Sequence, residues 1–563
     1  MKKILYMILG ITMALAACNS TNSGVSGETE TPDAVLCPVP FSRGVNFSTW
    51  FESSSAQGIP FTKYVEQDFA NVKSLGADVI RLPINMHSMT GGAPDYVFDP
   101  LLLKFLDYAV NWAEKYEIYI ILDNHSFDPS VNTDANIDRI LLKVWVQIAE
   151  RYKNRSKYVL YEILNEPHGI SDQRWGEIQG EVIKAIRQTD PEHTIIVGGT
   201  DYNSIGKLAA IPEYADRNLI YTFHFYDPFM FTHQGATWGG PPSMGSLAGV
   251  PFPADSKRMP ATPGDLRGTW VGRALNNYHN DAAPAKLYNA LDKTVAFSRE
   301  RNVPVFCGEF GVYMIQSPPE DRVRWYEFTA EALRKRNIPR ASWDYFGGFG
   351  IFNNENGGDF YADLNVGVAR AMGFTPPPQR PRSQQAIDSA LVIYDDYPAR
   401  DISVGYWGSE TDFSLYDTRT AKGEFAIRWG NAERYNVFWF GFRNGDFSRL
   451  AREGYSIEFQ ARTEKAAAFD IRFINPENAS SIPWRMRYTV DEKLLPPDGK
   501  WHTIRIALAD MQEQGAWVNA KQEWMSPRGK FSWKQIKQME FVAEDSDLKG
   551  RTIWFDSLKI VGP

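Results

Sequence analysis

The chain has 563 residues, 23% of them charged, and a formal net charge of −8 at pH 7. Because this length exceeds that of one compact core, two or three domains are expected. An acidic chain without a basic run does not suit nucleic acid or anionic membrane surfaces, and fits a neutral substrate. Aromatic residues make up 14% of the chain, including 17 Trp. Such rings fill β-rich cores and stack on flat apolar faces such as those of sugars.

Residues 1–17 have the pattern of an export signal. Lys2 and Lys3 precede an apolar stretch, Ile4–Leu15, that is too short to span a bilayer as a mature helix. The stretch ends in Leu15-Ala16-Ala17-Cys18, which resembles the lipobox of bacterial lipoproteins. The resemblance implies that Cys18 is acylated and becomes the mature N-terminus. The alternative is a plain secretory signal in which Cys18 is incidental.

Residues 18–38 are expected to form a flexible polar tether. Asn19 follows Cys18 where Asp would favour retention at the inner membrane, so a lipid anchor in the outer membrane or at the cell surface is expected. The remaining cysteines, Cys37 and Cys307, are too few for a disulfide framework. They either pair with each other or remain buried thiols. The protein is expected to be a monomer.

Residues 39–372 alternate short apolar runs with amphipathic helical patterns. Strands are predicted at 44–47, 78–83, 118–124, 158–165, 194–198, 219–226, 303–310 and 340–346. Helices are predicted at 63–75, 101–115, 138–152, 173–188, 285–301 and 319–336. Eight near-continuous apolar strands separated by helices indicate an α/β fold, a (β/α)₈ TIM barrel. A doubly wound open sheet is the alternative, but no GxGxxG turn follows the first strand.

Three further segments follow from composition. Residues 227–284 are rich in Gly, Pro and aromatic residues without helical period, and predict a long functional loop. Residues 373–385 form a Pro-rich linker. Residues 386–563 predict an all-β sandwich of jelly-roll type. Its strands are expected at 425–429, 437–442, 455–461, 469–474, 502–506, 540–542 and 552–560.

Two carboxyl groups are expected at the carboxyl ends of barrel strands. Pro167 cannot donate to a ladder and ends the fourth strand, which leaves Glu166 at the edge where such barrels build active sites. Glu309 ends the seventh strand in Gly308-Glu309-Phe310-Gly311. Hydrolysis of a glycosidic bond requires two such groups, one to protonate the leaving oxygen and one to attack the anomeric carbon or activate water.

Six other residues lie at neighbouring strand ends. They are Arg81, His125, Asn165, His224, Tyr226 and Trp343. Together with Glu166 and Glu309, they make the first domain resemble glycoside hydrolase family 5, the cellulase-type barrels. The resemblance implies a retaining, endo-acting hydrolase of β-1,4-glucan in which Glu309 is the nucleophile and Glu166 the acid/base. Arg81 and Tyr226 would support Glu309, Asn165 would read the sugar 2-OH, the histidines would bond to sugar or carboxyl groups, and Trp343 would stack on the sugar.

Several alternatives remain open. β-Mannan, glucomannan and xyloglucan are possible substrates, because family members differ mainly in their subsite loops. A non-catalytic cell-surface glycan-binding lipoprotein and a transglycosylase are the competing activities. No cofactor and no metal site are expected, since the histidines lack close spacing with carboxylate or Cys partners. His233, Gln234 and Trp238 in the long loop, and Trp50 after the first strand, are further candidates for sugar contact, with loop or core packing as the alternative.

The second domain resembles jelly-roll carbohydrate-binding modules through residues 498–504 and 553–560. The candidate glycan-binding residues are Tyr406, Trp407, Trp439 and Trp484, of which about half should face the core because strand residues alternate. Asp556 is a candidate ligand for a structural calcium. A purely structural accessory domain is the alternative.

Overall fold

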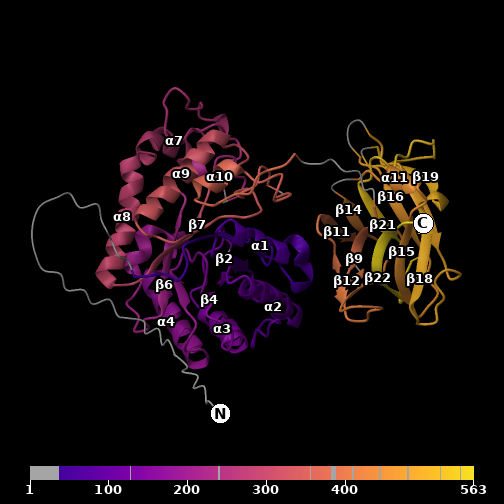
Figure 1. Ribbon diagram of the computed structural model, residues 1–563, viewed down its shortest axis with the longest axis horizontal. Helices are drawn as coiled ribbons and strands as arrows, with labels where there is room; N and C mark the ends of the chain where they lie inside the picture. Colours follow the sequence, from indigo (N-terminus) through magenta and orange to yellow (C-terminus); the bar gives the residue numbers. More distant parts are fainter. Residues whose placement is uncertain are drawn as a thin grey trace, which may run out of the picture. The chain divides into compact units, whose positions relative to one another are not determined.

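The computed structural model describes residues 37–563 except 127, 239–240, 356, 382–388, 409–410, 443–444, 478–480, 520 and 546. The predicted signal, the tether up to residue 36 and Cys18 lie outside the described residues. The described residues form two compact units (Figure 1): one lies within residues 37–54 and 66–380, the other within residues 55–65 and 381–563. No helix among the described residues is long and apolar enough to cross a membrane.

The first unit is a closed barrel of eight parallel strands in sequential order, which confirms the predicted fold over the open sheet. The strands are β1 (Arg43–Asn46), β2 (Val79–Ile84), β3 (Tyr119–Asn124), β4 (Val159–Glu162), β5 (Ile195–Gly198), β6 (Leu219–Phe225), β7 (Val305–Phe310) and β8 (Arg340–Ser342). Each lies within or one residue beyond its predicted range. β4 and β8 are shorter than predicted, because the chain leaves the sheet before reaching Asn165 and Trp343.

The barrel helices begin and end where local chemistry predicts. In α2 (Pro100–Lys115), Pro100 occupies the first turn and the side chain of Asp99 accepts a hydrogen bond from the amide of Leu101. One face of this helix is buried against the barrel. The other long helices are α1 (Glu66–Ser74), α3 (Asp138–Tyr152), α4 (Asp172–Thr189), α7 (Trp270–Asp281), α8 (Pro284–Arg301) and α9 (Pro319–Lys335). Short α5 (Thr200–Asn203), α6 (Phe229–Thr232) and α10 (Val366–Ala371) complete the unit.

Helix α7 corrects the prediction that residues 227–284 lack helical structure. Thr269 caps it by accepting a hydrogen bond from the amide of Gly272, and Val271, Leu275 and Tyr278 are buried along one side. The spacing of these three residues fits a helix, but the surrounding Gly and Pro residues obscure it in the sequence. Between α6 and α7, the described residues contain one short 3-10 helix, Gly264–Leu266, and are otherwise irregular.

The barrel interior is layered. Its lower layer is apolar, with buried side chains from seven strands: Val79, Ile121, Leu160, Ile196, Ile220, Phe306 and Ala341. Because strand residues alternate, the residues two positions further along three of these strands also face inward. They are Arg81, Asp123 and Glu162, all fully or almost fully buried. A charged layer therefore lies directly on the apolar core.

The second unit contains two antiparallel sheets around one hydrophobic core, as predicted for a β-sandwich. One sheet contains β9 (Leu391–Asp395), β10 (Tyr397–Pro398), β12 (Asp412–Asp417), β13 (Ala426–Gly430), β15 (Ser456–Thr463), β18 (His502–Ala507) and β22 (Thr552–Val561). The other contains β11 (Ile402–Trp407), β14 (Val437–Phe442), β16 (Phe469–Ile474), β17 (Arg485–Val490), β19 (Gln512–Val518), β20 (Glu523–Met525) and β21 (Gln538–Val542). The seven predicted strands are present; β9–β12, β17, β19 and β20 were not predicted.

A segment from the N-terminal half of the chain belongs to the second unit. Residues 55–65, between β1 and α1, group with the C-terminal residues in this unit. The hydroxyl of Tyr416 donates to the carbonyl of Ile59 at 3.0 Å, and the rings of Phe61 and Tyr397 lie 4.8 Å apart. The sequence did not indicate that this segment belongs to the second unit, because nothing in it distinguishes residues 55–65 from an ordinary barrel loop.

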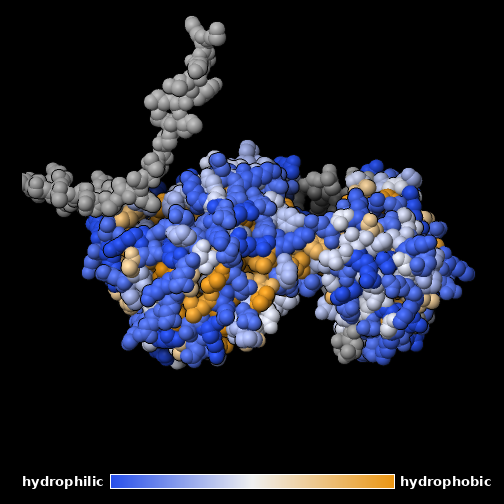
Figure 2. Space-filling view, turned by 90° about the horizontal axis from the view of Figure 1, so that it is seen from below, coloured by the Kyte–Doolittle hydropathy of each residue, from blue (hydrophilic) through white to orange (hydrophobic). Residues whose placement is uncertain are grey.

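The surface of the barrel unit is largely hydrophilic on the face drawn in Figure 2, with hydrophobic residues gathered in a band across it. Isolated exposed apolar residues are also present, among them Val97 and Val131, at 61% and 60% exposure. Scattered residues of this kind are ordinary on a soluble surface.

Candidate active site

A bulge in β7 turns Glu309 into the barrel. β6 and β7 stay in register until Cys307; the next β6 residue, His224, then lies opposite Glu309, so Gly308 is an extra residue. Such bulges change the direction of the side chains that follow them. A Cβ atom on Gly308 would lie 2.7 Å from Oγ1 of Thr222, so this position suits glycine.

Arg81 lies at the centre of a buried ion cluster. Its Nη1 donates to Oε1 of Glu309 at 2.7 Å, and its Nη2 donates to Oδ1 of Asn165 at 2.7 Å. Its Nε and Nη2 also donate to the two carboxylate oxygens of Glu162 at 2.7 and 2.8 Å. Oδ2 of Asp123 lies 3.0 Å from Nη2. One guanidinium therefore orients the carboxylate of Glu309 and the amide of Asn165 together.

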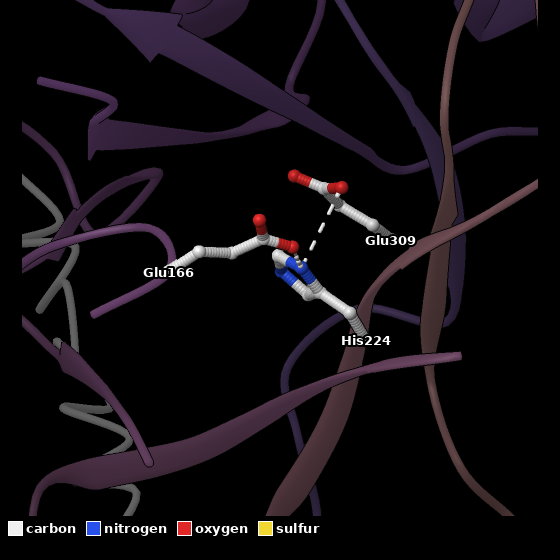
Figure 3. A group of neighbouring side chains, drawn as sticks. All are labelled: Glu166, His224 and Glu309. Carbon is white, nitrogen blue, oxygen red and sulfur yellow. Dashed lines mark hydrogen bonds and ion pairs between the residues drawn. The ribbon is translucent and has the colours of Figure 1, made fainter. Parts of the chain in front are cut away.

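Glu166 and Glu309 face each other across His224 (Figure 3). Nδ1 of His224 lies 2.6 Å from Oε1 of Glu166 and 3.5 Å from Oε2 of Glu309. The hydroxyl of Tyr226 donates to Oε2 of Glu309 at 2.8 Å. One oxygen of each carboxyl and one nitrogen of His224 all lie within 4.8 Å of one another. This geometry suits two carboxyl groups that exchange protons, and the same three donors are close enough to hold a metal ion.

The surroundings of Glu309 favour its ionised form. Burial disfavours the charge, but His224 and Arg81 are positively charged neighbours and Tyr226 donates a hydrogen bond. These contacts outweigh burial and hold the pKa of Glu309 below its ordinary value. The pKa of His224 is raised, because the negative charge of Glu309 and the contact with Glu166 outweigh its burial.

His125 and Trp343 form a stacked pair at the edge of the site, with ring centroids 5.4 Å apart and planes 12° apart. Nδ1 of His125 lies 2.7 Å from Oδ2 of Asp123. Burial disfavours the imidazolium, but the charge and hydrogen bond of Asp123 outweigh it and raise the pKa of His125 to about 9. The protonated ring is thus held flat against Trp343, which is itself partly exposed.

The structure brings together the eight residues predicted from strand ends. Three of the strands that carry these residues end earlier than predicted, β4 at Glu162, β6 at Phe225 and β8 at Ser342. Asn165, Glu166, Tyr226 and Trp343 therefore lie in the segments that follow these strands. The amide of Asn165 donates to the carbonyl of Asn124 at 3.0 Å, which continues the β3–β4 contact beyond the sheet. Glu166 is therefore held by a short extension of the barrel.

Sequence reasoning missed three residues of this cluster: Asn46, Asp123 and Glu162. The side chain of Asn46 donates to the carbonyls of Gly308 and Ser342 and accepts a hydrogen bond from Arg81. It therefore links β1 to β7 and β8, where the barrel closes. The alternation of side chains along a strand could have indicated Glu162. Glu162 lies two positions after the apolar Leu160, so an inward-facing Leu160 implies an inward-facing Glu162.

Two of the four further candidates for sugar contact, Trp50 and Gln234, are buried and do not face a ligand. Trp50 is fully buried and stacks on Trp112, with ring centroids 6.3 Å apart, so it belongs to the core. Gln234 is also fully buried. Its side chain donates to the carbonyls of Phe231 and Val250 and accepts from the amide of Val250, and it thereby fastens the loop. Packing dominated at both positions.

The other two loop candidates lie nearer the site. The ring of His233 stacks on Phe229 at 4.1 Å and meets the edge of Tyr226 at 5.0 Å, and burial lowers the pKa of His233 to about 3. A neutral His233 therefore forms part of the wall behind Tyr226. Trp238 is 44% exposed and meets Tyr313 edge-on at 4.7 Å, so one indole face can receive a ligand.

The remaining predictions concern the cysteines and the second unit. Cys37 and Cys307 form no disulfide, and Sγ of Cys37 donates to Oδ1 of Asn302. Oδ2 of Asp556 accepts from the amides of Ala421 and Lys422, so this carboxylate fastens a loop instead of offering that oxygen to calcium.

The aromatic candidates of the second unit divide into two groups. Trp484 is 8% exposed and too buried to bind a glycan, which corrects its assignment. Tyr406 and Trp407 are 54% and 62% exposed. Trp439 is partly exposed and packs over Gly405 on the outer face of the second sheet.

Comparison with known proteins identifies the family of the barrel. Residues 41–347, more than half of the chain, match the model of Cellulase (glycosyl hydrolase family 5). The chain belongs to glycosyl hydrolase family 5. The matched residues span the barrel from β1 to just beyond β8, and include all eight residues predicted from strand ends. The family assignment and the geometry of the two carboxyl groups thus agree.

Individual relatives extend the comparison. Endoglucanase 3 of Fibrobacter succinogenes is 29% identical over 355 residues, which are 59% of this chain and 52% of that protein. Endoglucanase H of Acetivibrio thermocellus is 26% identical over 520 residues, which are 88% of this chain and 51% of that protein. This family 5 chain thus spans about half the length of either relative. A solved endoglucanase, 23% identical with a TM-score of 0.50, covers 59% of this chain and 96% of its own, and shares the fold.

Proposed function

We propose that the barrel hydrolyses β-1,4-linked glucan internally, with retention of configuration. The observation that carries this proposal is the spacing of Glu166 and Glu309, which have oxygens within 4.8 Å of each other. Retaining glycosidases hold their carboxyl groups about 5–5.5 Å apart, whereas inverting enzymes leave roughly 6.5–9.5 Å for a water molecule. The names of the related endoglucanases support glucan as the substrate.

In the first step, Glu309 attacks the anomeric carbon while Glu166 gives its proton to the leaving oxygen. The glycosidic bond breaks and an ester forms between the sugar and Glu309. In the second step, Glu166 takes a proton from water, the water oxygen attacks the same carbon, and the ester bond breaks. His224, at 2.6 Å, is placed to share the proton of Glu166 between steps.

Supporting residues stabilise the charges of these steps. Arg81 and Tyr226 hold Glu309 ionised and aimed, since each donates to a different carboxylate oxygen. The carbonyl oxygen of Asn165 is occupied by Arg81, so its NH₂ group is the donor available to the sugar 2-OH. Trp343, stacked on His125, offers its other face to the sugar ring. The reaction needs no cofactor.

The test is a reducing-end assay of the protein without its leader on β-glucans, mannans, glucomannan and xyloglucan. We expect the highest activity on soluble β-1,4-glucan and a loss of at least 1,000-fold in Glu309→Gln, because a carboxamide cannot form the ester. Early-time NMR should show β-configured product. Equal activity of Glu309→Gln would exclude this assignment and favour a non-catalytic glycan-binding protein. Longer products at high substrate concentration would indicate a transglycosylase.

The second unit is proposed to bind glycan through the exposed aromatic residues of β11 and β14. Trp407 and Trp439 occupy this outer face, whose neighbouring positions carry charged groups such as Glu540, paired with Arg472 at 2.7 Å. In the Glu309→Gln background, Trp407→Ala should weaken binding to insoluble cellulose several-fold. Val392→Ala, at a 50% exposed position of the other sheet, is the matched control.

We propose the location from the pattern of residues 1–18. The protein is exported, acylated at Cys18 and anchored in the outer membrane as a monomer. Metabolic labelling with a radioactive fatty acid should mark the wild type and not Cys18→Ser. Light scattering of the protein without its leader should give the mass of one chain.

A further inference from the structure

Three consecutive residues after β5 have a left-handed backbone. Asp201, Tyr202 and Asn203, within α5, have φ values of +57°, +59° and +54°. Asp and Asn tolerate this conformation, but a bulky aromatic residue seldom adopts it. Such conformations persist only where surrounding contacts hold them, and they are concentrated at functional sites. The backbone therefore marks Tyr202 as a residue that the fold holds in one particular place.

The residues next to Tyr202 supply those contacts. Asn203 is fully buried, and its Oδ1 accepts a hydrogen bond from the amide of Gly199 at 3.2 Å. Ser204, the following residue, forms a parallel bridge with His224 of β6. The segment that carries Tyr202 is thus tied to the strand that carries an active-site histidine.

The ring of Tyr202 lies flat on the imidazole of His168, with ring centroids 4.4 Å apart and planes 14° apart. His168 follows Glu166 by two residues and is buried, whereas Tyr202 is 43% exposed. Burial and the nearby negative charge of Glu166 raise the pKa of the Tyr202 hydroxyl. The tyrosine therefore covers His168 and lies close to the acid/base residue.

His168 in turn holds the backbone of Glu166. Its Nδ1 donates to the carbonyl of Glu166 at 3.0 Å. The amide of His168 donates to Oγ1 of Thr133 at 3.1 Å, and its carbonyl accepts from the amide of Thr133 at 2.9 Å. Because the carboxyl group extends from the residue whose carbonyl is held, a fixed imidazole keeps that carboxyl beside Nδ1 of His224, 2.6 Å away.

We propose that Tyr202 is a positioning residue for the acid/base: its ring holds His168 in place and, through His168, the carboxyl group of Glu166. The inference rests on the proposed hydrolysis, in which Glu166 protonates the leaving oxygen and later activates water. It gives the segment after β5 a part in both of these proton transfers and none in the attack by Glu309. A misplacement of about 1 Å in a reacting group can lower a rate about 100-fold.

The test uses two substrates that depend differently on the proton donor. The leaving sugar of a cello-oligosaccharide needs a proton, whereas the dinitrophenolate of dinitrophenyl β-cellobioside leaves without one. Asn adopts the left-handed backbone readily, so Tyr202→Asn removes the ring without new strain. This variant should lower kcat/KM about 10-fold or more on the oligosaccharide and leave kcat/KM on the dinitrophenyl substrate nearly unchanged. On the dinitrophenyl substrate kcat should still fall, because turnover then waits for Glu166 to activate water.

Three further variants serve as references. Glu166→Ala removes the carboxyl group itself and should show the same pattern more strongly. Tyr202→Phe keeps the ring and should restore most of the lost activity. Tyr361→Asn changes a tyrosine of 44% exposure that packs against Arg380, and should alter neither substrate. Equal losses of kcat/KM on both substrates would overturn the inference. A raised KM for the oligosaccharide with unchanged kcat on both substrates would also overturn it, and would make Tyr202 a sugar contact.

A crystal structure of Tyr202→Asn decides the inference independently of activity. The ring of His168 should turn, and the carboxyl group of Glu166 should move about 1 Å or more from its place beside His224. An unmoved Glu166 would show that Tyr202 does not position it. If the wild type cleaves neither substrate, or Glu166→Ala lacks the expected pattern, the proposed hydrolysis fails, while the crystal structure still decides whether the ring positions Glu166.

Discussion

Arg81 and Glu162 form a bidentate ion pair inside the barrel, with Nε–Oε2 and Nη2–Oε1 distances of 2.7 and 2.8 Å. Glu162 lies too deep to meet substrate, yet it occupies one edge of the guanidinium whose other nitrogen reaches Glu309. The catalytic geometry is thus built on a charge pair below it. Because Glu162 fixes the guanidinium of Arg81 from below, the other donors of Arg81 are held toward Glu309 and Asn165.

Glu162→Gln should lower kcat about 10- to 100-fold with a smaller change in KM, because Arg81 loses a charged partner and shifts. Breaking such a buried pair also costs about 3–5 kcal/mol of folding free energy. Steady-state kinetics and urea unfolding measure the two effects. Glu150→Gln, at a residue whose side chain is 62% exposed, is the control. A normal kcat in a destabilised Glu162→Gln protein would mean that Glu162 is merely structural.

Gly308→Ala should lower kcat at least 10-fold, because the new Cβ would meet Oγ1 of Thr222 at 2.7 Å and displace the bulge that aims Glu309. That hydroxyl is buried without a hydrogen-bond partner, so Thr222→Ala alone should be mild. The double variant should recover much of the activity of the wild type. Activity loss that is additive in this double-mutant cycle would argue against the contact as the cause.

The acid limb of the pH profile should report Glu309. Its pKa lies below the ordinary value of 4.5, and the proposed nucleophile must be ionised to act. Activity should therefore persist below pH 4.5 and fall as the pH drops through the lowered pKa. Replacing Tyr226 with Phe removes one donor that lowers this pKa. The acid limb of kcat/KM in Tyr226→Phe should therefore move to higher pH.

His125 should make stability depend on pH in the alkaline range. Its pKa is raised to about 9 from 6.5, so the stabilisation from its charge is complete below pH 6.5 and is lost as the pH rises through 9. The unfolding midpoint of the wild type should therefore fall between pH 6.5 and 9 more steeply than that of His125→Gln. Parallel curves for the two proteins would exclude a charged His125.

Removal of metal should leave activity unchanged, since the proposed mechanism assigns both steps to Glu166 and Glu309. Dialysis against a chelator, followed by the reducing-end assay, measures this. Added Zn²⁺ should inhibit, because Glu166, His224 and Glu309 present donors within 4.8 Å of one another. Loss of activity after dialysis and its recovery with a divalent ion would instead assign a metal to this cluster.

Local pattern and the order of motifs were enough to predict the barrel, the sandwich and the eight strand-end residues. Each barrel strand is an apolar run that is followed by a polar residue. The apolar pattern therefore locates the strand, and the polar residue after it locates the site position. Glu162 and Asp123 were missed because they lie within such runs, where a buried charge is costly unless paired. Their partner Arg81 lies on β2, and only the pairing of β2, β3 and β4 in one register brings the three together.

Other features depended on long-range packing. Trp50, Gln234 and Trp484 have side chains that suit sugar binding, but burial removes them from any ligand. The segment 55–65 has no local mark of its place in the second unit. The sequence by itself determined which chemical groups stand at the strand ends and in which order. Tertiary structure decided which side chains share the charged layer, how the bulge at Gly308 aims Glu309 and which aromatic residues face solvent, because these depend on contacts between residues far apart in the chain.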